Sequence, residues 1–558
     1  MQIIYFKYLK NIRTFQVINV ITFFLLFWLI YIVIIFNQTV RAFFHKTNEN
    51  GAEQVIINEI EKEISTSLNQ DLRTSTKDFA NKHQLILNHI EEFWFYIQSE
   101  QNKLKADKSG NNALEQTDEY NKADTLNKVL DMTSQFKRSL MTNMAELRTL
   151  EGGQNIVANQ NAHLKDLIRA RLQYIQNPAD CATARKVSCM IDWPCGFGCQ
   201  LHHVTYCLII AYATNRTLVL DSSNWNYNSG GWEDLFEPLS RTCRTATGNG
   251  ITIWPNYGHD KQIIKLTQQT YGLDPKTAPG FIPRAVPQDI AAYLIHAEPI
   301  VWWVGQIVSY IFTPNAQLRA QLSAHATKIG FTHPIVGVHI RRSDKIGTEA
   351  DAHPIEQYMQ HVVEYYDQLS LRVNDVTRRV YVATDDRTVI GKIRARYPDY
   401  TVLGDEDIAR AADTRSRYTK AGLTGIVTDL WFLSHSDYLV CTFSSQICRI
   451  AYELLNSAAP GDASLNYKSL DDIWYFAGQL QNRQEVLEDH TPLDSDQIEL
   501  RVGDLVGPEG NHWDGYSLGT NFRTGQRGLY PSFKVKSKLE TYPFPTYPEV
   551  KIRSGLRK

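Results

Sequence analysis

Two neighbouring arginines, Arg341 and Arg342, directly follow a short apolar run in the segment "GVHIRRSDK" at 337–345. A guanidinium offers planar, paired N–H donors that match phosphate oxygens, which the point charge of a lysine does not reproduce. Lys and Arg total 58 and Asp and Glu total 60, so the chain lacks the broad positive field of a nucleic-acid binder. The sequence also lacks the glycine-rich phosphate motifs G-x-G-x-x-G and G-x-x-x-x-G-K-[ST]. We therefore expect a local anion site in which side chains hold a diphosphate.

Two further polar pairs, Asp385 with Asp386 and Ser444 with Ser445, also follow apolar runs. The three runs are short and continuous, as strands covered on both faces are, and they occupy 334–340, 378–386 and 437–445. Helical patterns lie at 354–371, 389–397, 425–434 and from 446 onward. This β-α-β order predicts a parallel sheet in an α/β domain, so the polar pairs should gather at its carboxyl edge. One of the two serines should cap the helix from 446, whose free N–H groups suit a phosphate.

The rest of the chain divides into segments of different composition. Residues 17–36 form an uncharged apolar run of about 20 residues, which predicts a transmembrane signal anchor after a cytoplasmic tail at 1–16. Amphipathic patterns over 51–176 predict a helical stem, either a spacer or a coiled-coil dimer seam. A compact domain rich in Trp, Tyr, Gly and Pro follows at 181–480. Residues 492–553, with a "GDLV" turn and "GLYPSFKV", resemble an SH3 β-barrel.

The cysteines indicate the compartment. All eight lie beyond the apolar run and are closely spaced, which is typical of disulfides formed in an oxidising lumen. The alternative is a zinc site, because Cys195, Cys199, His202 and His203 in "CGFGCQLHH" have ligand-like spacings. Glycosylation sequons occur at Asn37 and Asn215. We expect a type II membrane protein whose main domain is lumenal.

Several motifs in this order resemble the eukaryotic alpha-1,6-fucosyltransferases. They are "GVHIRRSDK", "GTEADAHPIEQYM", "YVATDD" and "CTFSSQICRIAYE", set between the anchor with its stem and the SH3-like end. The resemblance implies a Rossmann-like, GT-B-like catalytic domain in the Golgi membrane. It also implies inverting transfer of L-fucose from GDP-fucose to O6 of the innermost Asn-linked GlcNAc of N-glycans, without a metal or other cofactor.

The same resemblance implies roles for residues on the donor side. Arg341 matches an essential arginine on the β-phosphate, and strand alternation leaves Arg342 on the other face in a supporting role. His339 shares the face of Arg341 and should touch the nucleotide, unless it is a hydrogen-bonded core histidine. The other residues that match donor-site positions are Asp344, Tyr227, Asp385, Asp386, Asp429 and Ser445. The aspartates should accept hydrogen bonds from the guanine or the ribose, although Asp429 is otherwise an ordinary helix cap or surface charge.

For the reaction itself, Glu349 matches the general base that takes the proton of the acceptor hydroxyl, or else forms a simple salt bridge with Lys345. Lys345 and Arg341 should stabilise the negative charge of the departing GDP. The residues that match acceptor-site positions are Gln446, Asp471, Asp472, Tyr475 and His512, so the SH3-like unit should wall the glycan. Leu518 and Trp193 stand where the family pattern leads us to expect lysine.

The resemblance also implies four disulfides, which are Cys181–Cys243, Cys189–Cys207, Cys195–Cys199 and Cys441–Cys448. They would leave no thiol for zinc. Two other functions remain open at this point. Asp405 and Asp407 in "TVLGDEDIA" form a D-x-D pattern by which a metal-dependent sugar transferase could hold Mn²⁺. A membrane-tethered, non-enzymatic protein that binds through its SH3-like unit is the second alternative.

Overall fold

The computed structural model describes most of the chain from residue 153 onward and parts of the region before it. The described ranges are 80, 83–84, 86–88, 90–99, 102, 127, 129–135, 137–142, 144–145, 153–191, 193–257, 260–266, 279–342, 347, 351–412 and 416–550. They belong to one of two compact units, Ser75–Lys558. The predicted anchor at 17–36 lies outside them. No helix within the described ranges is both long enough and apolar enough to cross a bilayer.

The first sheet is a parallel α/β unit of four strands in the order β2-β1-β4-β3. The strands are β1 (Lys186–Met190), β2 (Thr217–Asp221), β3 (Ile251–Ile253) and β4 (Ile263–Lys265). Helix α5 (Phe197–Ala213) connects β1 to β2 and is buried along almost its whole length. Its sequence is apolar all round, as expected of a helix enclosed by other elements.

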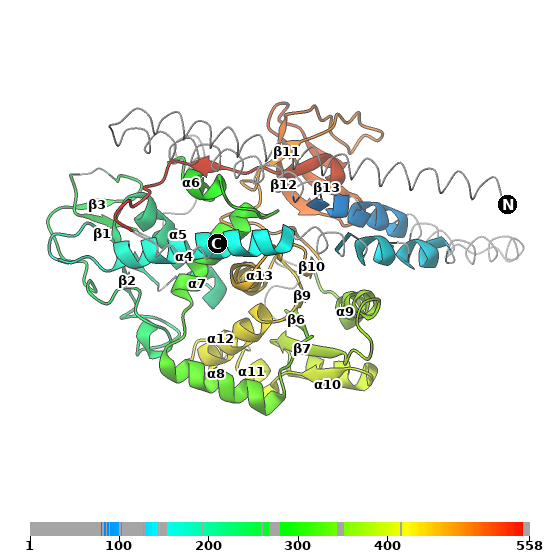
Figure 1. The fold of residues 1–558 in the computed structure, drawn as a ribbon, viewed down its shortest axis with the longest axis horizontal. Helices are drawn as coiled ribbons and strands as arrows, with labels where there is room; N and C mark the ends of the chain where they lie inside the picture. Colours follow the sequence, from blue (N-terminus) through cyan, green and yellow to red (C-terminus); the bar gives the residue numbers. More distant parts are fainter. Residues whose placement is uncertain are drawn as a thin grey trace, which may run out of the picture. The chain divides into compact units, whose positions relative to one another are not determined.

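The second sheet contains the three runs predicted from the sequence. Its five parallel strands have the order β10-β9-β6-β7-β8, with β6 in the centre (Figure 1). They are β6 (Val336–Ile340), β7 (Arg379–Thr384), β8 (Thr401–Leu403), β9 (Tyr438–Cys441) and β10 (Tyr467–Ser469). Each predicted run contains one of these strands, so the predicted parallel sheet is confirmed.

Helices cover both faces of the second sheet. Helix α9 (Ile355–Ser370) begins after Pro354, whose fixed φ suits the start of a helix, and α10 (Arg387–Arg396) begins after Asp386. Both occur close to where the sequence predicts them. Helix α12 (Lys420–Ser434) starts earlier than the predicted 425, because the Thr419 side chain caps it by accepting from Gly422 N. Short helix α11 (Glu406–Ala411) follows β8.

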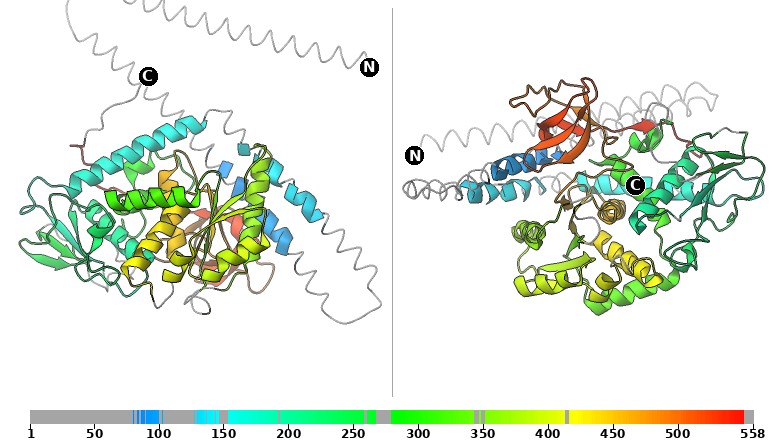
Figure 2. Two further views of the ribbon diagram at one scale, coloured as in Figure 1. Left: turned by 90° about the horizontal axis from the view of Figure 1, so that it is seen from below. Right: turned by 180° about the vertical axis from the view of Figure 1, so that it is seen from behind.

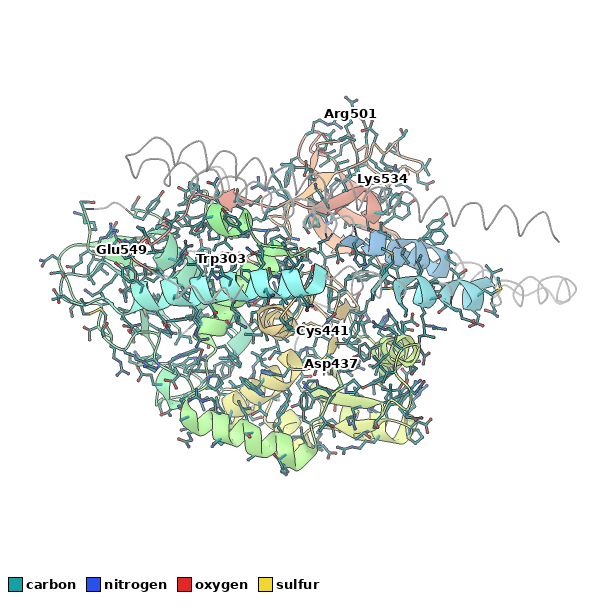
Figure 3. The ribbon with its side chains drawn as sticks, in the orientation of Figure 1. Trp303, Asp437, Cys441, Arg501, Lys534 and Glu549 are labelled. Carbon is teal, nitrogen blue, oxygen red and sulfur yellow. A yellow bond between two sulfur atoms is a disulfide. The ribbon has the colours of Figure 1, made fainter. Side chains whose placement is uncertain are left out.

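Two helices, α7 (Pro299–Ile311) and α13 (Gln446–Ala458), pack against each other between the two sheets (Figures 1 and 2). The contact is close because a Cβ on Gly305 would lie 2.3 Å from the Glu453 carbonyl. Trp303 of α7, labelled in Figure 3, is fully buried there. One continuous apolar core therefore joins the two α/β units, the GT-B-like arrangement that the sequence predicts.

The end of the predicted stem joins this core. Helix α4 (Gly153–Gln176) packs against β2 and α7, and its Leu164, Ile168 and Leu172 are almost completely buried. Its apolar face is thus covered by the chain's own α/β units. Helix α8 (Ala316–Ile329), capped by Asn315, and the short elements β5 (Val286–Pro287) and α6 (Gln288–Ala291) complete this part of the fold.

The C-terminal barrel is antiparallel, with strand order β14-β13-β12-β11-β15. The strands are β11 (Gln484–Val486), β12 (Leu505–Asn511), β13 (Tyr516–Asn521), β14 (Arg527–Pro531) and β15 (Val535–Ser537). It has its own small core around Val506 and Tyr530, and Figure 3 labels Arg501 and Lys534 on it. The chain then returns to the α/β part of the fold, where β16 (Thr541–Tyr542) pairs with β5.

The four predicted disulfides, Cys181–Cys243, Cys189–Cys207, Cys195–Cys199 and Cys441–Cys448, are all present. The two cysteines of the alternative zinc site are bonded to each other and therefore offer no thiolate. Among the described residues, Cys189, His203 and Cys207 form the one group with metal-ligand proximity, and its cysteines are also oxidised.

Candidate active site

The strand order creates a switch point at the centre of the second sheet. From β6 the chain runs outward through β7 and β8 and then returns to place β9 on the other side of β6. The carboxyl ends of β6 and β9 therefore flank the switch point, which is where ligands bind in open α/β sheets. Arg341 follows β6, and Ser444 and Ser445 follow β9. Cys441, labelled in Figure 3, ends β9 at this edge.

Arg341 is held at this edge by Asp385. Register pairs Ile340 with Thr384, so the next residue of each strand is adjacent. The Arg341 guanidinium donates from Nη1 to Asp385 Oδ2 at 2.6 Å, and the Arg342 backbone N–H donates to Asp385 Oδ1 at 2.7 Å. The side chains of Arg341 and Asp385 are 19% and 3% exposed. One carboxylate thus joins the side chain of Arg341 to the backbone of Arg342 and orients the arginine at this edge.

The faces of β6 decide where the arginine points. Val336, Val338 and Ile340 belong to the apolar cluster on the α9 side of the sheet. Gly337 faces the opposite side, where a Cβ would lie 2.8 Å from Ser436 Oγ at the end of α12. By alternation His339 and Arg341 share the face of Gly337. His339 is 7% exposed in the described structure.

The other predicted donor residues near this edge have local roles as well. Asp386 caps α10 by accepting from Thr388 N at 2.9 Å. Ser445 is the N-cap residue of α13, but its hydroxyl makes no capping hydrogen bond, so that detail of the prediction is wrong. The first backbone N–H groups of α13 lack the expected side-chain cap, and this end of the helix can accept an anion instead.

Asp429 is neither a cap nor a surface charge. It lies within α12, is 8% exposed, and accepts a hydrogen bond from the Tyr381 hydroxyl of β7 at 2.7 Å. Burial raises the pKa of Asp429 to about 7, and Asp405 nearby raises it further, against the Tyr381 hydrogen bond that lowers it. The carboxyl group is therefore able to hold a proton near neutral pH.

The first α/β unit supplies Tyr227, which lies beyond β2. Its hydroxyl accepts from Phe197 N at 3.0 Å at the start of α5, and its ring lies 4.9 Å from that of Tyr418 before α12. Burial raises the pKa of Tyr227 to about 12, while Arg417 and Arg341 favour its ionised form. Tyr227 of the first unit therefore lies close enough to Arg341 of the second for their charges to interact.

The predicted acceptor residues lie at the same edge, one strand further along. Asp471 and Asp472 come after β10, which is parallel to β9. Asp471 Oδ1 accepts from Ser469 Oγ at 3.0 Å and from Ser444 N at 3.3 Å, so it joins the β9 and β10 loops. Burial and the Asp471 charge raise the pKa of Asp472 to about 6.

Gln446 and Tyr475 are also in this region. Gln446 is the first residue of α13, and its Oε1 lies 3.0 Å from His202 Nδ1 of α5. The guanidinium of Arg449 lies 3.9 Å from the centre of the Tyr475 ring and donates to the Tyr475 carbonyl at 3.1 Å. The first turns of α13 thus contain one predicted acceptor residue, Gln446, and contact the other, Tyr475.

The barrel reaches the site through Trp513. Its indole N–H donates to the Asp471 carbonyl at 2.5 Å, and its ring packs edge-on against Phe95. The Lys468 ammonium lies 4.2 Å from the Trp513 ring, and burial lowers the Lys468 pKa to about 8. His512, the predicted glycan contact, is exposed and directly precedes Trp513.

Three predicted residues, Asp344, Lys345 and Glu349, lie outside the described residues.

The structure also shows the partners of the D-x-D carboxylates. Asp405 caps α11 by accepting from Asp407 N at 2.8 Å, and Asp407 pairs with Arg410 at 2.9 Å. Of the residues where lysine is expected, Leu518 lies in β13, and Trp193 packs against His203 with ring centres 4.7 Å apart.

Several site residues escaped the sequence analysis. Arg417, Tyr418 and Lys420 lie before or at the start of α12, and Lys420 donates to Asp234 of the first unit at 3.0 Å. The cationic segment "RSRYTK" was a usable signal, because it follows β8 toward the same edge. The sequence gives no signal for Arg449, Glu453 and Trp513, and it suggests His202 only as a zinc ligand, because their partners are far away in the sequence.

Comparison with known proteins agrees with this geometry. Residues 17–475 match the family described as alpha-(1,6)-fucosyltransferase N- and catalytic domains, and residues 486–536 match a variant SH3 domain. The Drosophila melanogaster alpha-(1,6)-fucosyltransferase is 43% identical over 464 residues, which cover 83% of this chain and 73% of that protein. The Caenorhabditis elegans protein of the same description is 39% identical over 414 residues, or 73% of each chain.

Two solved structures are similar at a much lower level. The fucosyltransferase NodZ from Bradyrhizobium has a TM-score of 0.31 and 15% identity, over 48% of this chain and 92% of that one. POFUT1 in complex with GDP has a TM-score of 0.33 and 14% identity, over 52% and 99%. These values are too low to carry weight.

The family and relatives define the chain as a glycosyltransferase, which removes the non-enzymatic alternative. Within that class, it belongs to the alpha-(1,6)-fucosyltransferase family, as the sequence motifs predict.

Proposed function

We propose that this enzyme transfers L-fucose from GDP-fucose to O6 of the innermost Asn-linked GlcNAc of N-glycans, with inversion at the fucose carbon and without a metal ion. Membership of the family supports fucose transfer and the 1,6 linkage. The observation that carries the proposal is Arg341, oriented by Asp385 at the switch point of a parallel sheet. A fixed guanidinium there suits a nucleoside diphosphate.

The donor lies between the two α/β units in this proposal. Arg341 binds the β-phosphate, and the free N–H groups at the start of α13, next to Ser445, face the diphosphate. His339 lies on the same face of β6, and Tyr227 closes the donor site from the first unit. The buried Asp429 of α12 accepts a hydrogen bond from a guanine N–H, together with Asp385 or Asp386.

Displacement of GDP then needs two charges to be managed. The departing diphosphate gains negative charge, which Arg341 and Lys345 stabilise. One such preorganised contact lowers the activation free energy by about 3 kcal/mol. The acceptor hydroxyl loses a proton as it attacks the opposite face of the fucose carbon. Glu349 takes that proton as general base. Asp344 belongs to the donor-binding residues as well, and Arg342 has a supporting role.

The acceptor glycan lies against the loop after β10 and the barrel. Asp471 and Asp472 are joined to the donor edge through Ser444 N, which supports a shared site. Gln446 borders it at the start of α13, Tyr475 borders it next to Arg449 of that helix, and His512 forms the wall on the barrel. The Trp513 hydrogen bond to Asp471 fixes this wall relative to the catalytic domain.

The metal-dependent alternative has weaker support. Asp405 and Asp407 belong to a helix cap and an ion pair, and both roles use the carboxylates that Mn²⁺ would need. Activity lost in a chelator and restored by manganese would favour it.

We also propose that the enzyme is a single-pass type II protein of the Golgi membrane, anchored by 17–36, with its stem as a homodimer seam. The disulfides support a lumenal domain. Protease protection in sealed vesicles tests the orientation, and sedimentation of the full chain tests the dimer.

The activity is tested by incubating the purified chain with GDP-fucose and a GlcNAc-terminated N-glycan on asparagine, with and without chelator. Linkage analysis should find fucose on O6 of the Asn-linked GlcNAc in both samples. Fucose on any other sugar would refute the proposed acceptor.

A further inference from the structure

Glu453 of α13 is a fully buried carboxylate that has no role in the proposed reaction. Its side chain is 0% exposed, and a buried charge is costly unless hydrogen bonds satisfy it. Both of its oxygens lie 3.1 Å from His202 Nε2, and Oε1 also accepts from the Trp474 indole at 3.0 Å. Because a carboxylate only accepts, the His202 Nε2 atom carries a proton toward it.

The other nitrogen of the same ring faces the acceptor site. His202 Nδ1 lies 3.0 Å from Oε1 of Gln446, so three side chains form one continuous chain from Glu453 to Gln446. The His202 ring thus holds one end of the Gln446 amide, and the other end of that amide points elsewhere. Gln446 is itself half-buried, at the first position of α13.

The backbone keeps this arrangement tight. A Cβ on Gly198 would lie 3.0 Å from the Cβ of Gln446, so the first turn of α5 presses on the first turn of α13. The His202 ring is further confined by Phe476, which meets it edge-on with ring centres 5.4 Å apart. His202 therefore has little freedom to move independently of Gln446.

A second arm leads from Glu453 to Tyr475. Trp474, which donates to Glu453, precedes Tyr475 directly. Gln446, Arg449 and Glu453 have the i, i+3, i+7 spacing of one helix face. That face of α13 is thus connected to both predicted acceptor residues. It carries Gln446, which contacts His202, and it reaches Tyr475 through Arg449 and Trp474.

We propose that His202 and Glu453 are positioning residues for the acceptor glycan. Glu453 fixes the His202 ring, His202 fixes one end of the Gln446 amide so that the other end meets a sugar hydroxyl, and Trp474 fixes the Tyr475 segment. Gln is rich in rotamers, so fixing it before binding removes an entropic cost of binding. This inference rests on the proposed function, in which Gln446 and Tyr475 contact the acceptor.

A double-mutant cycle tests the proposal in the full chain. His202→Phe keeps the ring and its packing on Phe476 but removes both hydrogen bonds. In the wild-type background it should raise the KM for the GlcNAc-terminated N-glycan about fivefold, the value of one hydrogen bond. In the Gln446→Ala background the same change should add less than twofold, because the residue that His202 orients is already gone.

Glu453→Gln is the second variant, in case His202→Phe does not fold. It keeps the size of the side chain and a carbonyl for Trp474 but removes the charge that fixes the ring. It should raise the acceptor KM in the same direction, while the affinity for GDP, measured by calorimetry, stays within twofold. The matched control is His490→Phe, because His490 Nε2 also lies 3.0 Å from a glutamine oxygen, in the barrel core.

Two results would overturn the inference: an effect of His202→Phe that persists undiminished in Gln446→Ala, or a loss of GDP affinity that parallels the rise in acceptor KM. Either would indicate a general structural role. Wild-type enzyme that fails to fucosylate the glycan refutes the proposed function instead. Wild-type enzyme that is active, with both variants normal in acceptor KM, refutes this inference alone.

Discussion

The second sheet carries an arginine–aspartate pair at each of its two edges. Arg341 and Asp385 follow β6 and β7, and their side chains are 19% and 3% exposed. Arg378 and Asp367 lie at the amino end of β7, joined at 2.8 Å, and are 32% and 34% exposed. Two tyrosine rings flank the Arg378 guanidinium at 5.8 and 6.0 Å.

The two pairs have the same chemistry but different surroundings. At the amino edge, exposed charges are screened and the arginine packs on aromatic rings, as in an ordinary surface contact. At the carboxyl edge, a nearly buried carboxylate holds its arginine at the switch point. The proposal that Arg341 binds the donor therefore has a matched control in the pair at the amino edge.

Removal of the arginines should give the largest contrast. Arg341→Ala should lower kcat about a hundredfold, because one preorganised contact to the leaving diphosphate is lost. Arg341→Lys should restore little, since an ammonium lacks the paired donors. Arg378→Ala should change kcat less than twofold. Steady-state rates with GDP-fucose measure all three, and equal losses from Arg341→Ala and Arg378→Ala would contradict the comparison.

The aspartates sharpen the contrast. In Asp385→Asn the new amide keeps an acceptor for Arg342 N but turns N–H groups toward the Arg341 guanidinium. The arginine should lose its orientation, and kcat/KM for GDP-fucose should fall about tenfold. Asp367→Asn breaks the corresponding pair at the amino edge and should leave this ratio unchanged. A normal ratio in Asp385→Asn would show that Arg341 needs no orienting partner.

A tryptophan at each edge extends the comparison to the acceptor. Trp513→Phe removes the hydrogen bond to the Asp471 carbonyl and should raise the acceptor KM about fivefold, with GDP affinity unchanged. Trp431→Phe is the control, because Trp431 stacks on His435 just before β9, at the amino edge. An acceptor KM that rises equally in both variants would argue against a barrel-dependent acceptor wall.

The smallest expected effect concerns pH and stability. Burial raises the pKa of Asp429 to about 7 from its ordinary 3.8, so the folded chain holds a proton that the unfolded chain releases. The free energy of unfolding should therefore fall as the pH rises from about 4 to about 7. In Asp429→Asn this contribution is absent.

Thermal unfolding at pH 5 and pH 8 checks this sign. The difference in Tm between wild type and Asp429→Asn should shift against the wild type by on the order of 3 °C at the higher pH. Asp399→Asn, an exposed aspartate at the amino end of β8, should show no such shift. A Tm difference that stays the same at both pH values would mean that Asp429 is already ionised in the fold at pH 5.

Much of the donor side follows from local sequence. Apolar runs that end in Arg341, Asp385 and Ser444 predict strands, and β-α-β order makes those strands parallel, so their carboxyl ends must meet. The register that pairs Ile340 with Thr384 then brings Arg341 to Asp385. The family motifs also imply the four disulfides and the barrel.

Other features of the site depend on contacts that no local pattern indicates. Ser445 occupies the predicted cap position, but its hydroxyl makes no cap bond, because cap geometry depends on side-chain rotation and not on residue type alone. Asp429 looks like a helix-surface charge in the sequence, yet the fold buries it against Tyr381.

The sequence by itself determined the chemistry of this enzyme: its strands, the polar residues at their ends and the family to which its motifs belong. Only the tertiary structure decided which side chains hold those residues in place. His202 reaches Glu453 across 251 positions, and Trp513 reaches Asp471 across 42. The physical reason is that strand and helix periodicity act over a few residues, whereas a buried hydrogen bond forms wherever packing brings a donor to an acceptor.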